Sequence, residues 1–185
     1  MARRLDPQRL MTQTASPLQP NPPDNITIRS FVPGEDDEAI VAAYREAFAD
    51  HYGYLEQPFA VDLTEWRRWM AADDFDPSLW FLAEEGDEIV GFLTTYAEAP
   101  GDPAVGWSDE LGVRPSWRRR GIGHALLIHA FSALARKGVR GAVLTVDTEN
   151  KSGAPALYDR VGMRSIRANR TYIRELRPGR NLVAA

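Results

Sequence analysis

The stretch WSDELGVRPSWRRRGIGHALLIHAFSALARKGVRGAVLTVD, residues 107–147, decides the fold, because two strand patterns flank one helix pattern in it. WSDELGV (107–113) is a short strand pattern that leads into a proline. The helix pattern begins at Gly121 and stops at Lys137-Gly138. GAVLTVD (141–147) is an apolar run of the kind found in strands that are buried on both faces. Strand, helix and strand in succession predict a βαβ unit with a right-handed crossover.

The helix entrance RRRGIGHAL (118–126) predicts an anion site. A helix N-terminus carries unpaired N–H groups and partial positive charge, glycine lets the backbone approach a ligand closely, and arginine adds charge-assisted hydrogen bonds. The expected phosphate-contacting residues are Arg118, Arg119, Arg120, Gly121, Ile122, Gly123, His124 and Ala125. The alternative is an ordinary solvated basic helix start, because short motifs often match by chance.

Two other phosphate-binding motifs do not fit this entrance. The dinucleotide-binding fingerprint requires a third glycine where Leu126 stands. A Walker loop requires Gly-Lys-Ser or Gly-Lys-Thr, which is absent from the stretch.

The flanking sequence completes the expected domain. Its elements are a strand at 26–32, a helix after the acidic turn 35–38, a second helix at 61–72 with Asp62 as cap, a hairpin of 79–85 and 88–98, a short helix at 152–161 and a final hairpin or pair of strands at 163–176. Together they predict a single α/β (α+β) domain. Its central sheet is expected to be mixed, mostly antiparallel and twisted, with helices on both faces.

Composition limits the class of protein. The 185 residues are 44% hydrophobic and 26% charged, which is typical of one soluble domain. The net charge of −4 gives no overall basic field, so we expect no nucleic-acid or membrane partner. The chain has no cysteine, which fits a cytoplasmic location, and His124 and His129 lie on different faces of their helix, so no metal is expected.

The first 24 residues are rich in proline and contain no apolar run long enough for a signal peptide or a membrane span. We therefore expect a disordered leader over 1–24 that lies outside the fold, a domain over 25–178 and a flexible tail over 179–185.

Residues 111–163 resemble the GNAT superfamily of acetyl-CoA-dependent N-acetyltransferases. The resemblance depends on Arg118-x-x-Gly121-x-Gly123 and on a later element formed by Asn150, Ala154, Leu157, Tyr158 and Gly162. Met163 stands where the family usually has phenylalanine, a change that affects packing more than chemistry. The segments YREAFADHYG and DFDPSLWFLAEEGDEIVGF are most similar to the actinobacterial branch that includes the C-terminal half of mycothiol synthase.

The resemblance implies acetyl-CoA as co-substrate, with its diphosphate on the amides of the helix entrance. It also implies that strands 107–113 and 141–147 splay apart, so that the pantetheine arm bonds to the backbone of Leu111, Val113 and Arg114. Asn150 would lie near the pantetheine or the sulfur, or act as the N-cap of the next helix. Tyr158 matches the family's general acid for the departing thiolate; the alternative is a core tyrosine.

The candidate general base is Glu110. Alternation along the strand puts Leu111 and Val113 on one face and Ser108, Glu110 and Gly112 on the other. Asp109 is the alternative, because a bulge would swap the faces. Both carboxylates could instead be solvated, and water could suffice for an amine of low pKa.

The resemblance thus implies transfer of an acetyl group from acetyl-CoA to the primary amine of a small molecule, by direct attack in a ternary complex. The acceptor pocket is expected between residues 35–72 and the late strands, although most aromatic residues there fit the core better. A protein or peptide N-acetyltransferase is the alternative enzyme, and a non-catalytic acyl-CoA sensor is the alternative of another class. A homodimer is possible.

Overall fold

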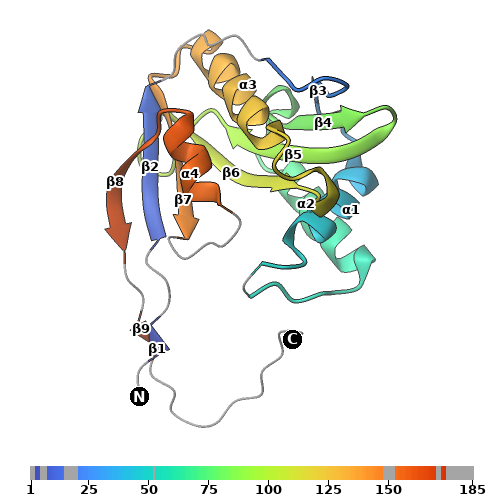
Figure 1. Cartoon of the computed structure of the whole chain (residues 1–185). Coiled ribbons are helices and arrows are strands. Elements are labelled where there is room, and N and C mark those ends of the chain that lie inside the picture. The colour runs from blue at the N-terminus through green and yellow to red at the C-terminus, as the bar shows by residue number, and fades with distance from the viewer. Residues whose placement is uncertain are drawn as a thin grey trace.

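A seven-stranded mixed sheet runs through the domain in the order β3-β4-β5-β6-β7-β2-β8 (Figure 1). The computed structural model describes residues 3–4, 8–14, 21–51, 53–147, 153–169 and 172–173. The strands are β1 (Arg3–Arg4), β2 (Gln8–Thr14), β3 (Thr27–Ser30), β4 (Phe81–Glu85), β5 (Glu88–Tyr96), β6 (Val105–Val113), β7 (Gly141–Asp147), β8 (Arg164–Asn169) and β9 (Tyr172–Ile173). The helices are α1 (Asp37–Phe48), α2 (Phe59–Met70), α3 (Ile122–Arg136) and α4 (Ala154–Arg160).

The predicted βαβ unit is present as β6, α3 and β7. These two strands pair in parallel, whereas every other neighbouring pair in the sheet is antiparallel. The expected mixed and mostly antiparallel sheet is therefore confirmed. The predicted hairpin of β4 and β5 is confirmed as well, with Gly86 at φ +64° in its turn.

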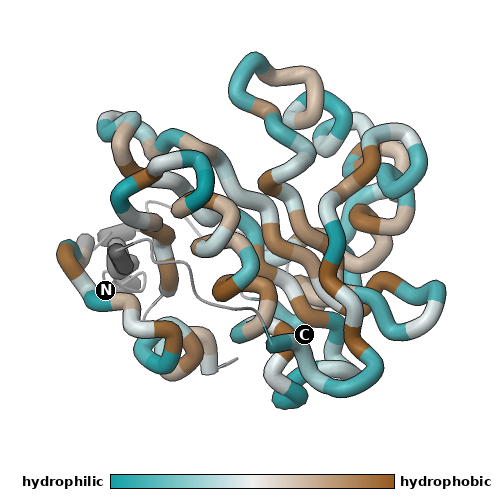
Figure 2. Tube along the Cα trace, turned by 90° about the horizontal axis from the view of Figure 1, so that it is seen from above, coloured by the Kyte–Doolittle hydropathy of each residue, from teal (hydrophilic) through white to brown (hydrophobic). Residues whose placement is uncertain are grey.

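Helices cover both faces of the sheet, as predicted (Figure 1). One core cluster joins the sheet to α3 and α4 through residues such as Leu93, Leu126 and Phe131. The other joins it to α1 and α2 through Trp66 and Phe92. Figure 2 shows hydrophobic segments along the strands between these helical layers. Trp66 is buried core and Tyr44 and Phe48 pack against it partly buried, whereas Phe59 and Trp69 are exposed.

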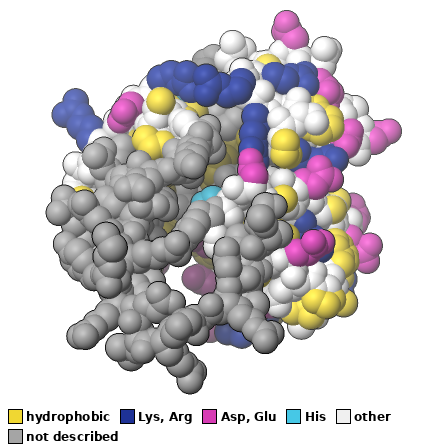
Figure 3. All heavy atoms as spheres, turned by 60° about the horizontal axis from the view of Figure 1, so that its bottom comes forward, with side chains coloured by type: hydrophobic (Ala, Val, Ile, Leu, Met, Phe, Trp, Pro, Cys, Tyr) yellow, Lys and Arg dark blue, Asp and Glu magenta, His cyan; other side chains and the backbone are white. Residues whose placement is uncertain are grey.

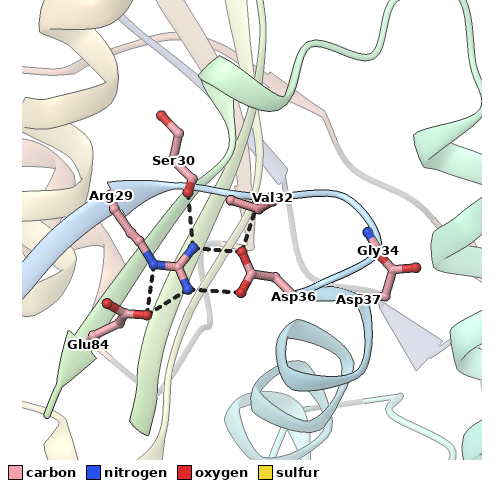
Figure 4. A network of polar contacts seen from close by, with 7 residues as sticks. All are labelled: Arg29, Ser30, Val32, Gly34, Asp36, Asp37 and Glu84. Carbon is pink, nitrogen blue, oxygen red and sulfur yellow. Dashed lines mark hydrogen bonds and ion pairs between the residues drawn. The ribbon is translucent and has the colours of Figure 1, made fainter. Parts of the chain in front are cut away.

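A charged network fixes the start of α1 against the sheet (Figure 4). The guanidinium of Arg29 in β3 donates to Asp36 at 2.6 and 2.8 Å and to Glu84 in β4 at 2.8 Å. Asp36 also accepts from the Val32 N–H at 2.7 Å, and this bonding holds the pKa of its carboxyl below the usual range. The network ties β3, β4 and α1 together.

Helix α2 begins earlier than predicted. It starts at Phe59 after Pro58, so Asp62 lies inside its first turn and not at the cap. The Asp62 carboxylate accepts instead from Arg45 of α1. The predicted cap is therefore wrong: this carboxylate joins two helices.

Strand β2 is the main departure from the sequence prediction. Residues 8–14, expected in a leader outside the fold, lie between β7 and β8 and pair with β7 along their whole length. The segment QRLMTQT has two apolar residues and a proline-rich sequence after it, so its strand signal is weak, and pairing with two distant strands determines its conformation.

The end of the chain contains two strands, β8 and β9, which is one of the two predicted alternatives. β8 pairs with β2 and β9 pairs with β1, so the other alternative, a hairpin, is not formed. The predicted tail over 179–185 lies outside the described residues.

Candidate active site

β6 and β7 separate after a short paired stretch. Their parallel pairing joins Val105–Trp107 to Gly141–Val143, and no pair joins 108–113 to 144–147. The splay implied by the family resemblance is confirmed. It leaves a gap in the sheet on the β7 side of β6.

Backbone groups of β6 point into this gap. The Arg114 N–H donates to the Val90 carbonyl at 2.9 Å, so Arg114 faces β5. Since hydrogen-bonding directions alternate along an antiparallel strand, the N–H and C=O groups of Leu111 and Val113 face β7. The Val113 carbonyl accepts from Arg118 Nε at 3.1 Å. The expected backbone contact through Arg114 is wrong, because its N–H is bonded within the sheet and its carbonyl accepts from the Trp117 N–H.

A β-bulge interrupts β6 beside the gap. Leu93 of β5 pairs with Leu111 and Thr95 pairs with Ser108, so the single residue Thr94 opposes both Asp109 and Glu110. The Thr94 Oγ1 accepts from the Glu110 N–H at 3.0 Å.

The bulge changes which face of the sheet the side chains of β6 occupy on either side of it. A Cβ at Gly106 would lie 2.7 Å from Leu134 of α3, whereas one at Gly112 would lie 3.0 Å from the Ala47 Cβ of α1. Glu110 therefore lies on the α1 face with Gly112, opposite to Leu111 and Val113, as predicted. Ser108 lies on the α3 face with Gly106, so its predicted side is wrong.

Asp109 shares the α1 face with Glu110. The Trp107 side chain, which belongs to the α1 face through its pairing with Tyr96, donates from Nε1 to Asp109 Oδ1 at 3.0 Å. Asp109 is exposed and Glu110 is largely covered. The bulge thus places both candidate carboxylates on one side of the sheet.

The environment of Glu110 raises the pKa of its carboxyl, as a general base requires. Burial raises the pKa of its carboxyl to about 7, and the charge of Asp109 contributes to the rise. A carboxyl group with a pKa near neutrality can accept a proton at physiological pH.

The charge of Glu110 affects the pKa of three tyrosines. Burial first, and then negative charge that includes the charge of Glu110, raises the pKa of Tyr44 of α1, Tyr96 of β5 and Tyr158 of α4 to about 12. Tyr44 and Tyr96 were not predicted from the sequence as neighbours of the base. The alternation of Thr94 and Tyr96 on β5 was the available signal, but reading it requires the register of β5 against β6.

Tyr158 is both a core residue and a neighbour of the gap. It is 7% exposed and belongs to the cluster that packs α4 against α3. Burial raises the pKa of the Tyr158 hydroxyl, and the negative charge of Glu110 contributes to the rise. Glu110 and Tyr158, predicted as base and acid, therefore lie within electrostatic range of each other, and their catalytic roles stay predictions.

The first turn of α3 has amides without an intrahelical partner. The first helical hydrogen bond joins the Ala125 N–H to the Gly121 carbonyl, so the N–H groups of Ile122, Gly123 and His124 precede the ladder. Gly121 has a φ of +89° and provides no side-chain cap. A Cβ at Gly123 would lie 3.1 Å from Leu157 Cδ2, so glycine here also allows α3 to approach α4 closely.

The three arginines at this entrance have different environments. Arg118 donates to Asp50 at 2.5 and 2.9 Å and to the Ala47 carbonyl at 2.8 Å, so it ties the loop to the end of α1. Arg120 pairs with Glu85 of β4. Within the described residues Arg119 has no carboxylate partner, and its guanidinium lies 3.3 Å from the Cβ position of Gly153. The structure does not direct Arg118 toward phosphate.

On the face seen in Figure 3, basic and acidic side chains of the described residues lie beside one another, which agrees with local pairing of this kind. Asn150, the remaining predicted cofactor residue, lies outside the described residues. Within the part of the chain that the structure describes, no helix is long and apolar enough to cross a membrane, and no group of three or more histidine or acidic side chains is placed to hold a metal ion.

Known proteins are similar to this chain in sequence and fold. Residues 30–163 match the Acetyltransferase (GNAT) family. The chain is 41% identical to the mycothiol acetyltransferase of Streptomyces scabiei over 148 residues, which cover 79% of this chain and 45% of that protein. It is 36% identical to the mycothiol acetyltransferase of Arthrobacter sp. over 76% of this chain and 43% of that protein. The chain spans about half the length of the curated relatives it matches.

Solved structures agree with this relationship. A GCN5-related N-acetyltransferase from Sphaerobacter thermophilus superposes with a TM-score of 0.82 at 36% identity, over 100% of this chain and 56% of that one. PaiA N-acetyltransferase of Thermoplasma acidophilum, solved with coenzyme A, shares the fold at 22% identity and a TM-score of 0.60, over 73% of this chain and 87% of that one. Sequence and fold together show that the chain belongs to the GNAT family of acetyltransferases.

Proposed function

We propose that this chain transfers an acetyl group from acetyl-CoA to the primary amine of a small molecule, by direct attack in a ternary complex. The observation that supports this most strongly is the gap between β6 and β7, with Glu110 beside it, Tyr158 coupled to it and the amides of the first turn of α3 at its end. These are the groups needed to bind a thioester and to move two protons.

The co-substrate is proposed to bind through backbone more than side chains. Its diphosphate accepts from the amides of residues 121–124, which precede the first helical hydrogen bond, and Arg119 provides the side-chain charge. Its pantetheine arm bonds to the β6 edge at Leu111 and Val113, as an added strand would. Asn150 is proposed as a further contact of the pantetheine or the sulfur.

The chemistry begins with an amine that is mostly ammonium at neutral pH. Glu110, with a pKa of about 7, accepts a proton from it. The amine nitrogen then attacks the thioester carbonyl, so a C–N bond forms and the C–S bond breaks. The Tyr158 hydroxyl donates a proton to the departing sulfur, which leaves as a thiol. The second nitrogen proton, which is lost as the amide forms, restores the Tyr158 hydroxyl.

The two proton transfers are coupled through charge. The negative charge of Glu110 contributes to the raised pKa of Tyr158. Once Glu110 has taken a proton, this charge is neutralised and the phenol becomes a stronger acid. Burial, the larger cause, continues to hold the pKa of the phenol above its ordinary value.

The acceptor is proposed to be a small cationic amine. Asp109 and Glu110 lie on one face beside Tyr44 and Tyr96, which combines negative charge with aromatic surface. Several relatives of about twice this length are named mycothiol acetyltransferase, so the form of mycothiol that lacks the acetyl group is the first amine to test.

Thiol release from acetyl-CoA tests the proposal. The amines are deacetylated mycothiol, an amino sugar, a diamine and a lysine-containing peptide, and Glu110→Gln is the control. We expect release with a small amine and a loss of about 10²- to 10⁴-fold in the variant. Release with the peptide alone would favour a protein acetyltransferase, and coenzyme A binding without release for any amine would favour a sensor.

A further inference from the structure

We propose that Thr94 is a positioning residue for the base: its hydroxyl holds the backbone of Glu110 at the bulge and so determines where the carboxyl lies. This inference rests on the proposed role of Glu110.

The pairing of β5 and β6 explains why a side chain is needed there. One β5 residue, Thr94, opposes two β6 residues, so the backbone of β5 lacks one carbonyl for the extra N–H. The Thr94 Oγ1 accepts from the Glu110 N–H at 3.0 Å in its place. Thr94 is 2% exposed, so water does not replace this acceptor.

Loss of the acceptor has a geometric consequence. A buried N–H without a partner costs about 1–3 kcal/mol. β6 can avoid this cost by giving up the bulge and resuming regular pairing. Because successive side chains of a regular strand alternate between faces, Glu110 could not then stay with both Asp109 and Gly112 on the α1 face. Either Asp109 leaves this face, so that Glu110 loses the neighbouring charge, or Glu110 itself leaves its buried environment. Both changes lower the pKa of Glu110.

The next residue provides a matched control. Thr95 is also fully buried, but it lies on the α3 face with Ser108, and within the described residues its Oγ1 has no hydrogen-bond partner. The same substitution to valine at 94 and at 95 therefore removes a bonded hydroxyl in one variant and an unbonded hydroxyl in the other.

The pKa of the Glu110 carboxyl indicates whether this group is buried. The groups coupled to it electrostatically are Asp109 on its own strand, Tyr44 on α1, Tyr96 on β5 and Tyr158 on α4. The tyrosines stay neutral below about pH 10, so the titration of Glu110 depends chiefly on burial and on Asp109. A carboxyl that moves into solvent titrates at a lower pH.

The test is a ¹³C NMR titration of the Glu110 side chain in the full chain, for the wild type, Thr94→Val, Thr94→Ser and Thr95→Val. We expect the pKa of Glu110 to fall by about 1 or more in Thr94→Val. Thr94→Ser keeps the hydroxyl, and Thr95→Val leaves the bulge intact, so both should titrate as the wild type does. Coenzyme A affinity should stay unchanged in all four proteins, while kcat with an accepted amine falls about tenfold or more in Thr94→Val alone.

An unchanged Glu110 titration in folded Thr94→Val would overturn the inference. If that variant does not fold, Thr94→Ala removes the same acceptor and is read in the same way. Failure of both to fold, with Thr94→Ser and the wild type titrating alike, would make Thr94 a structural residue and overturn the positioning role. Full activity of Glu110→Gln would instead refute the proposed base, and the NMR titration distinguishes that failure from a failure at Thr94.

Discussion

Replacing Glu110 by glutamine should change how the stability of the protein depends on pH. Burial raises the pKa of this carboxyl from 4.5 to about 7 in the folded protein. Between these two values the unfolded chain is ionised while the folded protein still holds the proton. The free energy of unfolding therefore falls as the pH rises through this window. At 1.36 kcal/mol per pH unit, the full penalty above pH 7 is about 3 kcal/mol.

Glutamine has nearly the same shape and no charge, so Glu110→Gln should lack this decline. We expect the variant to gain about 3 kcal/mol relative to the wild type between pH 4.5 and pH 8, while it loses activity. Urea unfolding at a series of pH values measures the difference. Asp109→Asn removes a charge one residue earlier from an exposed side chain, so its own contribution should stay below about 1 kcal/mol. Parallel stability curves for Glu110→Gln and the wild type would refute the reasoning.

Three further variants test other parts of the structure. Tyr158→Phe should lower kcat more than tenfold with little change in the KM for acetyl-CoA, since only the proton donor is lost; equal loss of both would show a structural role. Deleting residues 1–20 should lower the melting temperature, because β7 and β8 lose β2 between them; an unchanged melting curve would show that β2 contributes nothing to the sheet. Gly112→Ala should destabilise the fold by about 1–3 kcal/mol, because its Cβ would lie 2.5 Å from the Phe92 ring; wild-type stability in urea would contradict the packing described.

Local patterns were sufficient for the βαβ unit and the entrance of α3. Gly121 and the apolar periodicity after it encode the helix start without reference to the rest of the chain. The splay of β6 from β7 followed from the family resemblance, and the bulge at Asp109 and Glu110 was anticipated as an alternative.

Long-range contacts were not predictable in the same way. Whether Arg118 faces a phosphate or Asp50 depends on a residue 68 positions away. The incorporation of β2 depends on strands near the other end of the chain. The role of Thr94 requires the register of two strands, because the sequence TTY looks the same whichever threonine meets the bulge.

The central claim is that the amides entering α3 and the gap beside Glu110 together hold acetyl-CoA. A crystal structure of the protein with acetyl-CoA tests it most directly. We predict phosphate oxygens on the N–H groups of residues 121–124, pantetheine along the β6 edge at the Leu111 backbone and the Val113 N–H, and the thioester between Glu110 and Tyr158. Acetyl-CoA bound elsewhere, with the β6–β7 gap closed by side chains, would contradict it.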